Sequence, residues 1–174
     1  MEIDKLVFLD ESGTNTGMTR LYGRGPSDER VVDYTPDVRF ERTSILSSVR
    51  INGDMVPLVY DGALNGELFK AYITRCLVPT LSKGDIVIMD NLTSHKVAGV
   101  VDSITAVGAT VVYLPAYSPD FNPIEMMWSK IKAYLKKVKA RTKEALETAI
   151  AEALDRVTTS DILAWFAECG YSIH

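Results

Sequence analysis

The sequence predicts a single α/β domain in which helices flank a mixed β-sheet. Its 174 residues, 47% hydrophobic and 24% charged, have the size and composition of one globular domain. Strand-like segments dominate the first third, strands alternate with helices in the middle, and helical periodicity fills the last third. We expect one domain over residues 1–174, with no linker or internal repeat.

The first third predicts antiparallel strands. Residues 6–9 form a short apolar run followed by turn residues, and glycines and a proline close a second short strand at 20–22. Residues 43–51 and 55–60 are β-branched and apolar, and the Asn-Gly-Asp sequence between them is a strong hairpin signal.

The middle third predicts alternating helices and strands. Apolar positions between 65 and 76 lie on one helical face, and Asn65 is placed to cap that helix. Strands are expected at 85–89 and 110–114, with a helix over 94–107 between them. Strands joined through a helix should run parallel.

The last third predicts helices. A proline-rich loop precedes a helix that begins at Pro123, with Asn122 as N-cap. Further C-terminal helices are expected from about residue 142, with Thr142 and Ser160 as N-caps. The helix that begins at Pro123 has an apolar stripe that should pack on the sheet: Ile124, Trp128, Ile131, Leu135 and Val138.

Several classes of protein are excluded. Cys76 and Cys169 form no CxxC pair, which argues against a zinc ribbon or a disulfide framework. The sequence contains no membrane-length apolar run, no signal peptide and no nucleotide-binding glycine motif, so we expect a cytoplasmic protein without a membrane partner.

The charge is unevenly distributed. The net charge of −4 argues mildly against a nucleic-acid partner, yet residues 126–143 carry seven basic side chains and no acidic one. Such a run is usually a solvated helix face; beside an active site it is placed to bind a DNA backbone.

Three carboxylates are candidates for chemistry. Asp10 and Asp90 each follow an apolar strand, where side chains of α/β sheets converge, and Glu125 lies in the first turn of the helix that should pack on that sheet. Converging carboxylates repel one another unless a cation neutralises them, and oxygen ligands suit Mg²⁺ or Mn²⁺. Two such ions support phosphodiester cleavage or exchange.

Structural interpretations of the same residues stay open. Glu125, three positions after Asn122, resembles a capping box. Asp10 and Asp90 could be turn residues that accept hydrogen bonds from their own backbone. Spacing alone does not decide between these interpretations.

The sequence context resembles the DDE transposases of the IS630/Tc1/mariner superfamily, with the IS630 branch the most similar. The motifs that carry the resemblance are FLDESG at 8–13, IMDNLTSH at 88–95 and LPAYSPDFNPIEMMW at 114–128. The 34 residues between Asp90 and Glu125 match that family, and FAECGY at 166–171 resembles the IS630 C-terminus. The resemblance covers essentially the whole chain.

The resemblance implies an RNase H-like core, a five-stranded mixed sheet whose first three strands are antiparallel. It implies that Asp10, Asp90 and Glu125 hold two Mg²⁺ or Mn²⁺ ions, that water cleaves DNA at the transposon ends and that the freed 3′-hydroxyl attacks a target, typically at TA. DNA is then the partner. The helix-turn-helix region of the family is expected to be absent, which leaves a separate helix-turn-helix protein or frame and a homodimer as further partners.

Other residues are assigned around this core. Asn91 and His95 are candidate auxiliary residues for the metal-bound water, the nucleophile or the scissile phosphate, although both also fit turn or cap positions. Glu11 should point away from Asp10 and be structural, and Trp128 should pack. The basic residues expected to contact DNA are Lys130, Lys132, Lys136, Lys137, Lys139 and Arg24.

Two other functions remain alternatives to the transposase. One is a non-catalytic transposase remnant that binds DNA or protein. The other is a general RNase H-like nuclease or integrase. Metal binding separates the first from an enzyme, and strand joining separates the second from a transposase.

Overall fold

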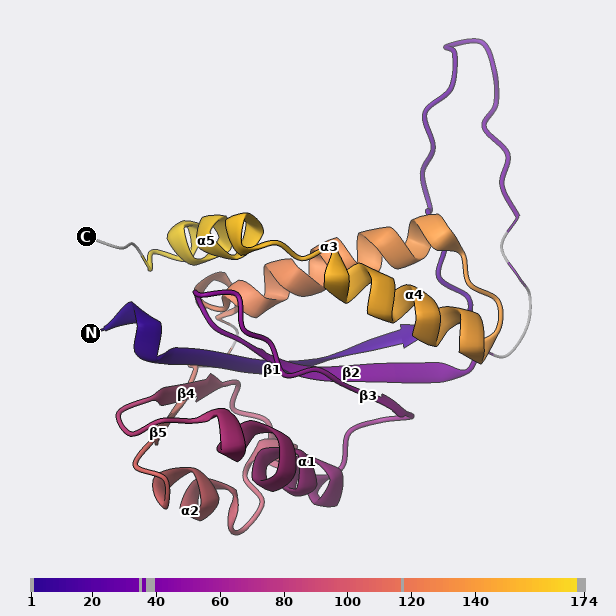
Figure 1. Ribbon diagram of the computed structural model, residues 1–174. Helices are drawn as coiled ribbons and strands as arrows, with labels where there is room; N and C mark the ends of the chain where they lie inside the picture. The colour runs from indigo at the N-terminus through magenta and orange to yellow at the C-terminus, as the bar shows by residue number, and fades with distance from the viewer. Residues whose placement is uncertain (1, 35, 37–39, 117, 172–174) are drawn as a thin grey trace.

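The computed structural model describes residues 2–34, 36, 40–116 and 118–171. A five-stranded sheet in the order β3-β2-β1-β4-β5 lies between two helical layers (Figure 1). The strands are β1 (Leu6–Asn15), β2 (Arg42–Val49), β3 (Leu58–Asp61), β4 (Ile86–Met89) and β5 (Thr110–Tyr113). The helices are α1 (Gly66–Tyr72), α2 (Val100–Thr105), α3 (Pro123–Val138), α4 (Lys143–Asp155) and α5 (Thr159–Glu168).

The sheet confirms the predicted mixed topology. β1, β2 and β3 pair antiparallel in sequence order, whereas β4 pairs parallel with β1 and with β5. β4 and β5 are joined through α2, as the crossover rule requires. The architecture is the predicted mixed five-stranded α/β sheet.

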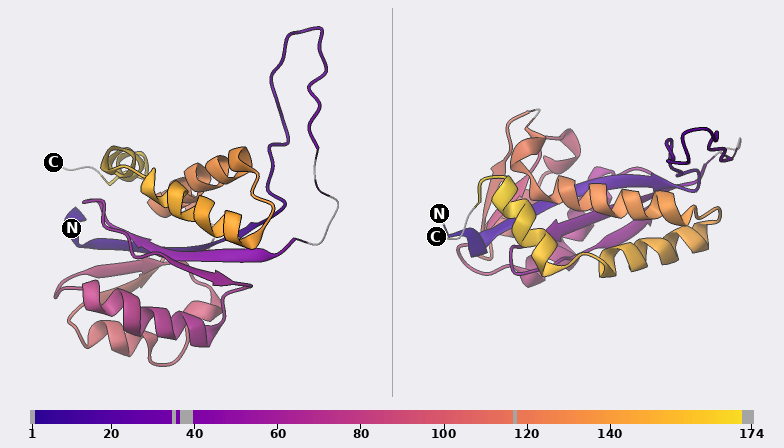
Figure 2. Two further views of the ribbon diagram at one scale, coloured as in Figure 1. Left: turned by 45° about the vertical axis from the view of Figure 1, so that its right-hand side comes forward. Right: turned by 90° about the horizontal axis from the view of Figure 1, so that it is seen from above.

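Alternation along β1 gives each face of the sheet its own core. Leu6 and Phe8 pack with α3, α4 and α5, while Val7 and Leu9 pack with α1, α2 and β4. Figure 2 shows the two helical layers on opposite faces of the sheet. Neighbouring residues of β1 therefore face different helical layers, which matters for the residues that follow Leu9.

The predicted strand at 20–22 is wrong. Residues 20–34, which we call the arm, follow β1 after a short buried segment and project from the body without strand structure (Figures 1 and 2). An extended segment needs a neighbouring strand to satisfy its backbone groups, and none lies beside the arm among the described residues. The local pattern of glycines and apolar residues is typical of a strand followed by a turn, but no strand forms here.

Two local predictions also need correction. Residues 94–107 form a 3₁₀ turn, Thr93–His95, and a separate short α2, because Gly99 adopts a left-handed conformation (φ 89°) between them. Thr158, not Ser160, caps α5 in a full capping box with Asp161. Thr142 and Asn65 cap α4 and α1 as predicted.

The apolar stripe of α3 ends earlier than predicted. Ile124, Trp128, Ile131 and Leu135 are buried together with Met127, whereas Val138 is exposed. Among the described residues, no helix is long and apolar enough to cross a bilayer.

Candidate active site

Asp10 and Asp90 are neighbours, because each comes directly after the segment in which β1 and β4 pair in parallel. Leu9 of β1 is aligned with Met89 of β4, so the residues that follow them in sequence are neighbours. Asp10 still belongs to β1 and is 6% exposed, whereas Asp90 leaves β4 at its carboxyl end. The apolar run before each acid thus brings both carboxylates to the same place.

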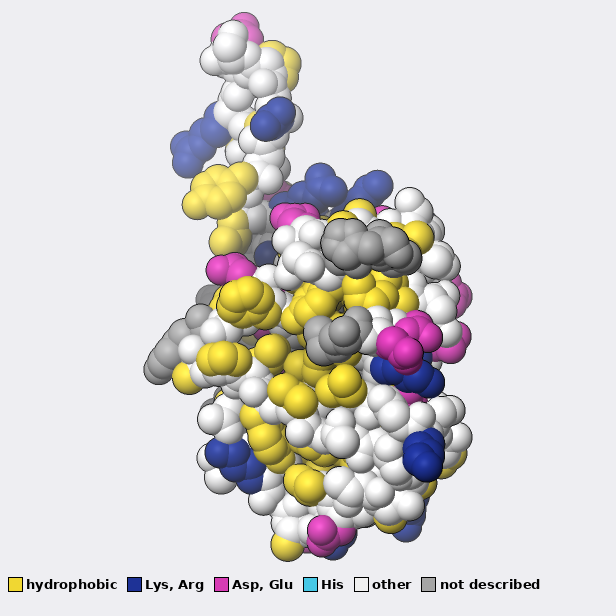
Figure 3. All heavy atoms as spheres, turned by 90° about the vertical axis from the view of Figure 1, so that its left-hand side faces the viewer, with side chains coloured by type: hydrophobic (Ala, Val, Ile, Leu, Met, Phe, Trp, Pro, Cys, Tyr) yellow, Lys and Arg dark blue, Asp and Glu magenta, His cyan; other side chains and the backbone are white. Residues whose placement is uncertain are grey.

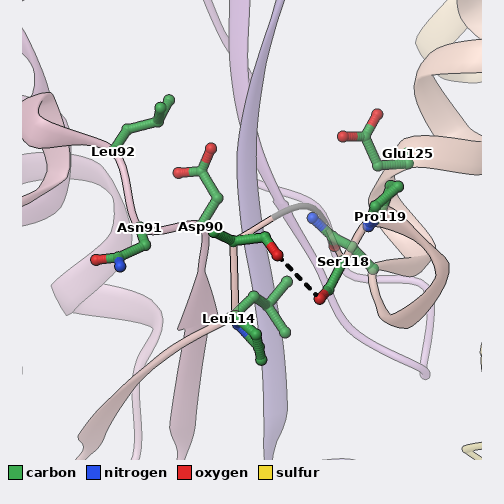
Figure 4. Close-up of a pocket in the computed structure, with 10 residues that line it drawn as sticks. Asp90, Asn91, Leu92, Leu114, Ser118, Pro119 and Glu125 are labelled. Carbon is green, nitrogen blue, oxygen red and sulfur yellow. Dashed lines mark hydrogen bonds between the residues drawn. The ribbon is translucent and has the colours of Figure 1, made fainter.

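Glu125 reaches this place from the first turn of α3. The side chain of Asn122 makes no capping hydrogen bond, and Pro123 occupies the first helical position. The capping-box interpretation of Glu125 therefore fails. In Figure 4 the carboxyl groups of Asp90 and Glu125 lie at the same side of one pocket.

The three carboxylates repel one another electrostatically. Burial, and then the charges of Glu125, Glu11 and Asp90, raise the pKa of Asp10 to about 7. Burial also raises the pKa of Glu125, with Asp90 and Glu11 acting in the same direction and Lys132 opposing them. The negative charges of Glu125 and Asp90 therefore disfavour the ionised form of Asp10.

Trp128 is part of the site, although the sequence predicted only packing for it. Its indole Nε1–H donates a hydrogen bond to Oδ2 of Asp10 at 3.0 Å, in buried surroundings. Trp128 lies one turn after Glu125 on α3, so the same helix supplies an acid and fixes another. The helical spacing from Glu125 was the signal that could have indicated this role.

A cavity of about 390 Å³ adjoins the carboxylates. Asp90 and Glu125 line it together with Asn91 and with the loop after β5, including Pro115 and Asn122. The Oδ1 atom of Asn122 is buried there without a hydrogen-bond partner. Residues of the proline-rich motif thus form a wall of this pocket, and Asn91 lines it as well.

His95 does not fit a role in direct contact with substrate. The residue is 0% exposed, and both ring nitrogens face protein oxygens. Burial disfavours its charged form, but the contacts with Asp90 and Glu11 outweigh that effect and raise the pKa of His95 to about 10. The predicted contact of His95 with the scissile phosphate is therefore wrong, because no surface of the ring is free.

The basic residues of α3 divide into two groups. Lys130 pairs with Asp161 and donates to the backbone oxygen of Arg156 at 2.8 Å, and Lys139 pairs with Asp33. These two side chains hold α5 and the arm. The second group faces cavities that the arm also lines: Lys132 and Lys136 with Arg20, and Lys137 with Arg24.

The acidic residues suit a hard divalent cation. Asp10, Asp90 and Glu125 offer only oxygen donors. The Oδ1 atom of Asp90 is buried, and although it lies 2.5 Å from Nδ1 of His95, it has no aligned hydrogen bond. Within the described ranges, no three His, Cys, Asp or Glu side chains are gathered closely enough to hold an ion, so binding would require these side chains to approach.

Comparison with solved structures identifies the fold. The chain is similar to the Mos1 transposase paired-end complex with the left transposon end (TM-score 0.73, 15% identity, 96% of this chain and 52% of that chain). It is also similar to the Mos1 strand transfer complex (TM-score 0.71, 16% identity, 96% of this chain and 52% of that chain). A third similar structure is the catalytic domain of Mos1 mariner transposase (TM-score 0.67, 14% identity, 96% of this chain and 78% of that chain). The chain thus spans about half the length of the Mos1 chain in the two complexes.

The matched fold is the RNase H-like sheet predicted from the sequence. No curated protein matches the chain at a significant level. The family model described as DDE superfamily endonuclease matches residues 5–147, which include Asp10, Asp90 and Glu125. The chain therefore belongs to the DDE superfamily endonucleases, the group to which its sequence motifs pointed.

Proposed function

We propose that the chain is a transposase catalytic domain that cleaves DNA at transposon ends and joins the freed 3′-hydroxyl to a target, typically at TA. Asp10, Asp90 and Glu125 would hold two Mg²⁺ or Mn²⁺ ions. The observation that carries the proposal is geometric: the register of β1 and β4 puts Asp10 next to Asp90, and Asp90 and Glu125 line one pocket. Membership of the DDE endonucleases supports it.

Each part of the site has a role in this proposal. Bound divalent ions supply charge neutralisation and activation of the attacking oxygen at a phosphodiester. The Trp128 indole orients Asp10, and the first turn of α3 fixes Glu125 relative to the sheet. The pocket next to Asp90 and Glu125 receives the DNA strand, with Asn91 at its wall. The protein contributes mainly positioning.

Cleavage and joining can be tested separately. Supercoiled plasmid is incubated with the chain and Mg²⁺, Mn²⁺ or EDTA, and nicked product is measured on gels. An oligonucleotide with a free 3′-hydroxyl is then offered with fresh plasmid, and joined product is measured. Metal-dependent nicking with joining supports the transposase. Nicking without joining supports a general nuclease, and absence of metal binding and nicking supports a non-catalytic remnant.

The DNA backbone is proposed to follow one face of α3. Glu125, Lys132 and Lys136 share that face, because seven and eleven residues correspond to whole turns of helix. Lys132 is close enough to counteract the raised pKa of Glu125, and with Lys136 and Arg20 it lines a cavity. Lys137 and Arg24 extend this surface towards the arm.

Neutralising this face should weaken DNA binding. For Lys132→Gln or Lys136→Gln, we expect a shallower salt dependence of the dissociation constant, by about one unit of log–log slope for each phosphate that the variant no longer neutralises. Fluorescence anisotropy with duplex DNA at several salt concentrations measures this slope. Lys83→Gln is the matched control, because Lys83 is exposed and precedes β4, at the opposite end of that strand from Asp90. Equal slopes in all three variants would contradict the assigned path.

A homodimer and a helix-turn-helix partner belong to the same proposal. The arm exposes apolar side chains, with Tyr22 88% and Tyr34 86% accessible, and Figure 3 shows hydrophobic and basic side chains along it. Exposed apolar groups on a projecting segment favour burial against another chain. The Mos1 paired-end complex contains the left transposon end, and we propose that a helix-turn-helix partner recognises such ends for this chain.

Polar substitution in the arm should abolish dimerisation. We expect the wild-type chain to sediment as a dimer at micromolar concentration and the double variant Leu21→Ser/Tyr22→Ser to sediment as a monomer. Val101→Ser on α2 is the control, because it removes an exposed apolar side chain on another surface. A monomeric wild type, or an unchanged dimer in the double variant, would contradict dimerisation through the arm.

A further inference from the structure

His95 lies in the core beneath the carboxylates. It ends the 3₁₀ turn Thr93–His95, five residues after Asp90. Its ring stacks on Phe69 of α1, with the ring centroids 4.5 Å apart and an interplanar angle of 23°. The turn and the stack fix the ring plane, so that only its two nitrogen atoms are left to interact at its edges.

The two nitrogen atoms contact two different carboxylates, one in β1 and one directly after β4. Nδ1 lies 2.5 Å from Oδ1 of Asp90 and 3.4 Å from the backbone oxygen of Asp90. Nε2 lies 2.9 Å from Oε2 of Glu11. The ring thus connects Glu11 of β1 with Asp90, the residue that follows β4.

Glu11 reaches His95 because it points away from Asp10. Asp10 faces α3, where Trp128 binds it, whereas Glu11 faces the α1 side of the sheet. Its side chain is 19% exposed, and its link to His95 spans 84 residues of sequence. The predicted opposite orientation of Glu11 is correct, and its structural role has a defined partner.

We propose that His95 is a positioning residue that fixes the carboxylate of Asp90 for metal binding, and that Glu11 anchors His95. This inference rests on the proposed metal-dependent function. Packing alone does not explain the site, because an apolar ring would fill the space against Phe69 without placing two buried nitrogen atoms against charged groups. Partners that orient a metal ligand typically affect metal affinity.

Two substitutions of His95 separate positioning from packing. In His95→Asn the amide can take the place of Nδ1 and still contact Asp90, whereas in His95→Gln the amide reaches the place of Nε2 and contacts only Glu11. Both variants lack the ring, its charge and its stack on Phe69. We expect His95→Gln to bind Mn²⁺ about tenfold more weakly than His95→Asn, as measured by calorimetry on the complete chain. Thermal unfolding of both variants without metal measures the shared packing loss.

The outcomes distinguish this inference from the proposed function. If the wild-type chain binds Mn²⁺ and the two variants bind it equally, His95 has only a packing role and the inference is overturned. If the wild-type chain binds no Mn²⁺, the proposed metal site itself fails, and the inference fails with it.

Glu11 provides a second comparison that leaves the buried ring in place. Glu11→Gln removes the charge but retains an oxygen that accepts from Nε2–H, whereas Glu11→Ala removes both. We expect weaker Mn²⁺ binding by Glu11→Ala than by Glu11→Gln. Equal affinities for this pair would overturn the anchoring role, even where the His95 variants fold poorly.

Discussion

Replacing any one of Asp10, Asp90 or Glu125 by its amide should reduce divalent-dependent DNA nicking by about a thousandfold or more. Each substitution removes one of the three carboxylates that the proposal assigns to the metal ions. An amide keeps the size of the side chain but does not neutralise a cation. The measurement is the initial rate of plasmid nicking at saturating Mn²⁺, with Mn²⁺ affinity measured in parallel.

A matched control keeps this result specific. Asp102→Asn removes an exposed acid on α2, on the other helical layer, and should leave the nicking rate unchanged. Circular dichroism should show the wild-type fold in every variant, because the amide keeps the size of the acid and an oxygen that can still face Trp128 at position 10 and His95 at position 90. Nicking at the wild-type rate by all three amide variants would exclude these acids as the catalytic group.

The place of Asp10 and Asp90 in the site could be predicted from local sequence, because the residues directly before each acid determine where it lies. Each acid follows four apolar residues, and such a run forms a buried strand wherever the chain places it. The parallel alignment of Leu9 with Met89 then follows from the mixed sheet. Glu125 was predictable for a similar reason, since Pro123 fixes where α3 begins.

Contacts between distant residues were not predictable in this way. The hydrogen bond from Trp128 to Asp10 spans 118 residues, and that between His95 and Glu11 spans 84. No periodicity in the sequence relates such pairs. The strand predicted at 20–22 failed for the same reason, because whether an extended segment becomes a strand depends on a partner that lies elsewhere in the chain.

The basic run of α3 shows a further limit of sequence patterns. Lys130 and Lys132 are two positions apart, yet Lys130 binds Asp161 while Lys132 faces the arm and Glu125. Residues two apart on a helix point in different directions. The sequence therefore predicted the sign of the charge on this helix, and only the packing of α5 and the arm distinguishes the lysines that form ion pairs from those that line the cavities.

The free energy of unfolding of the metal-free protein should fall as pH rises from about 4 to about 7. The folded state raises the pKa of Asp10 from 3.8 to about 7, mainly through burial. Below the lower value, both the folded and the unfolded chain carry the proton. Between the two values only the unfolded chain releases it, so unfolding becomes more favourable, and above about 7 the loss is complete. At 1.36 kcal/mol per unit of pKa, the loss is on the order of 4 kcal/mol.

Asp10→Asn isolates this contribution. The amide resembles the protonated acid, so urea unfolding in EDTA should give similar stabilities for variant and wild type near pH 4 and a growing advantage for the variant up to about pH 7. The raised pKa of His95 does not interfere below its ordinary value of 6.5, because both states hold that proton there. Saturating Mn²⁺ should restore stability to the wild type above pH 7 and give little to Asp10→Asn, because a cation offsets a charge that only the wild type carries. Parallel stability curves for the two proteins from pH 4 to pH 8 would mean that ionisation of Asp10 does not destabilise the folded state. The carboxylates would then need no cation to neutralise them, which contradicts the proposed chemistry.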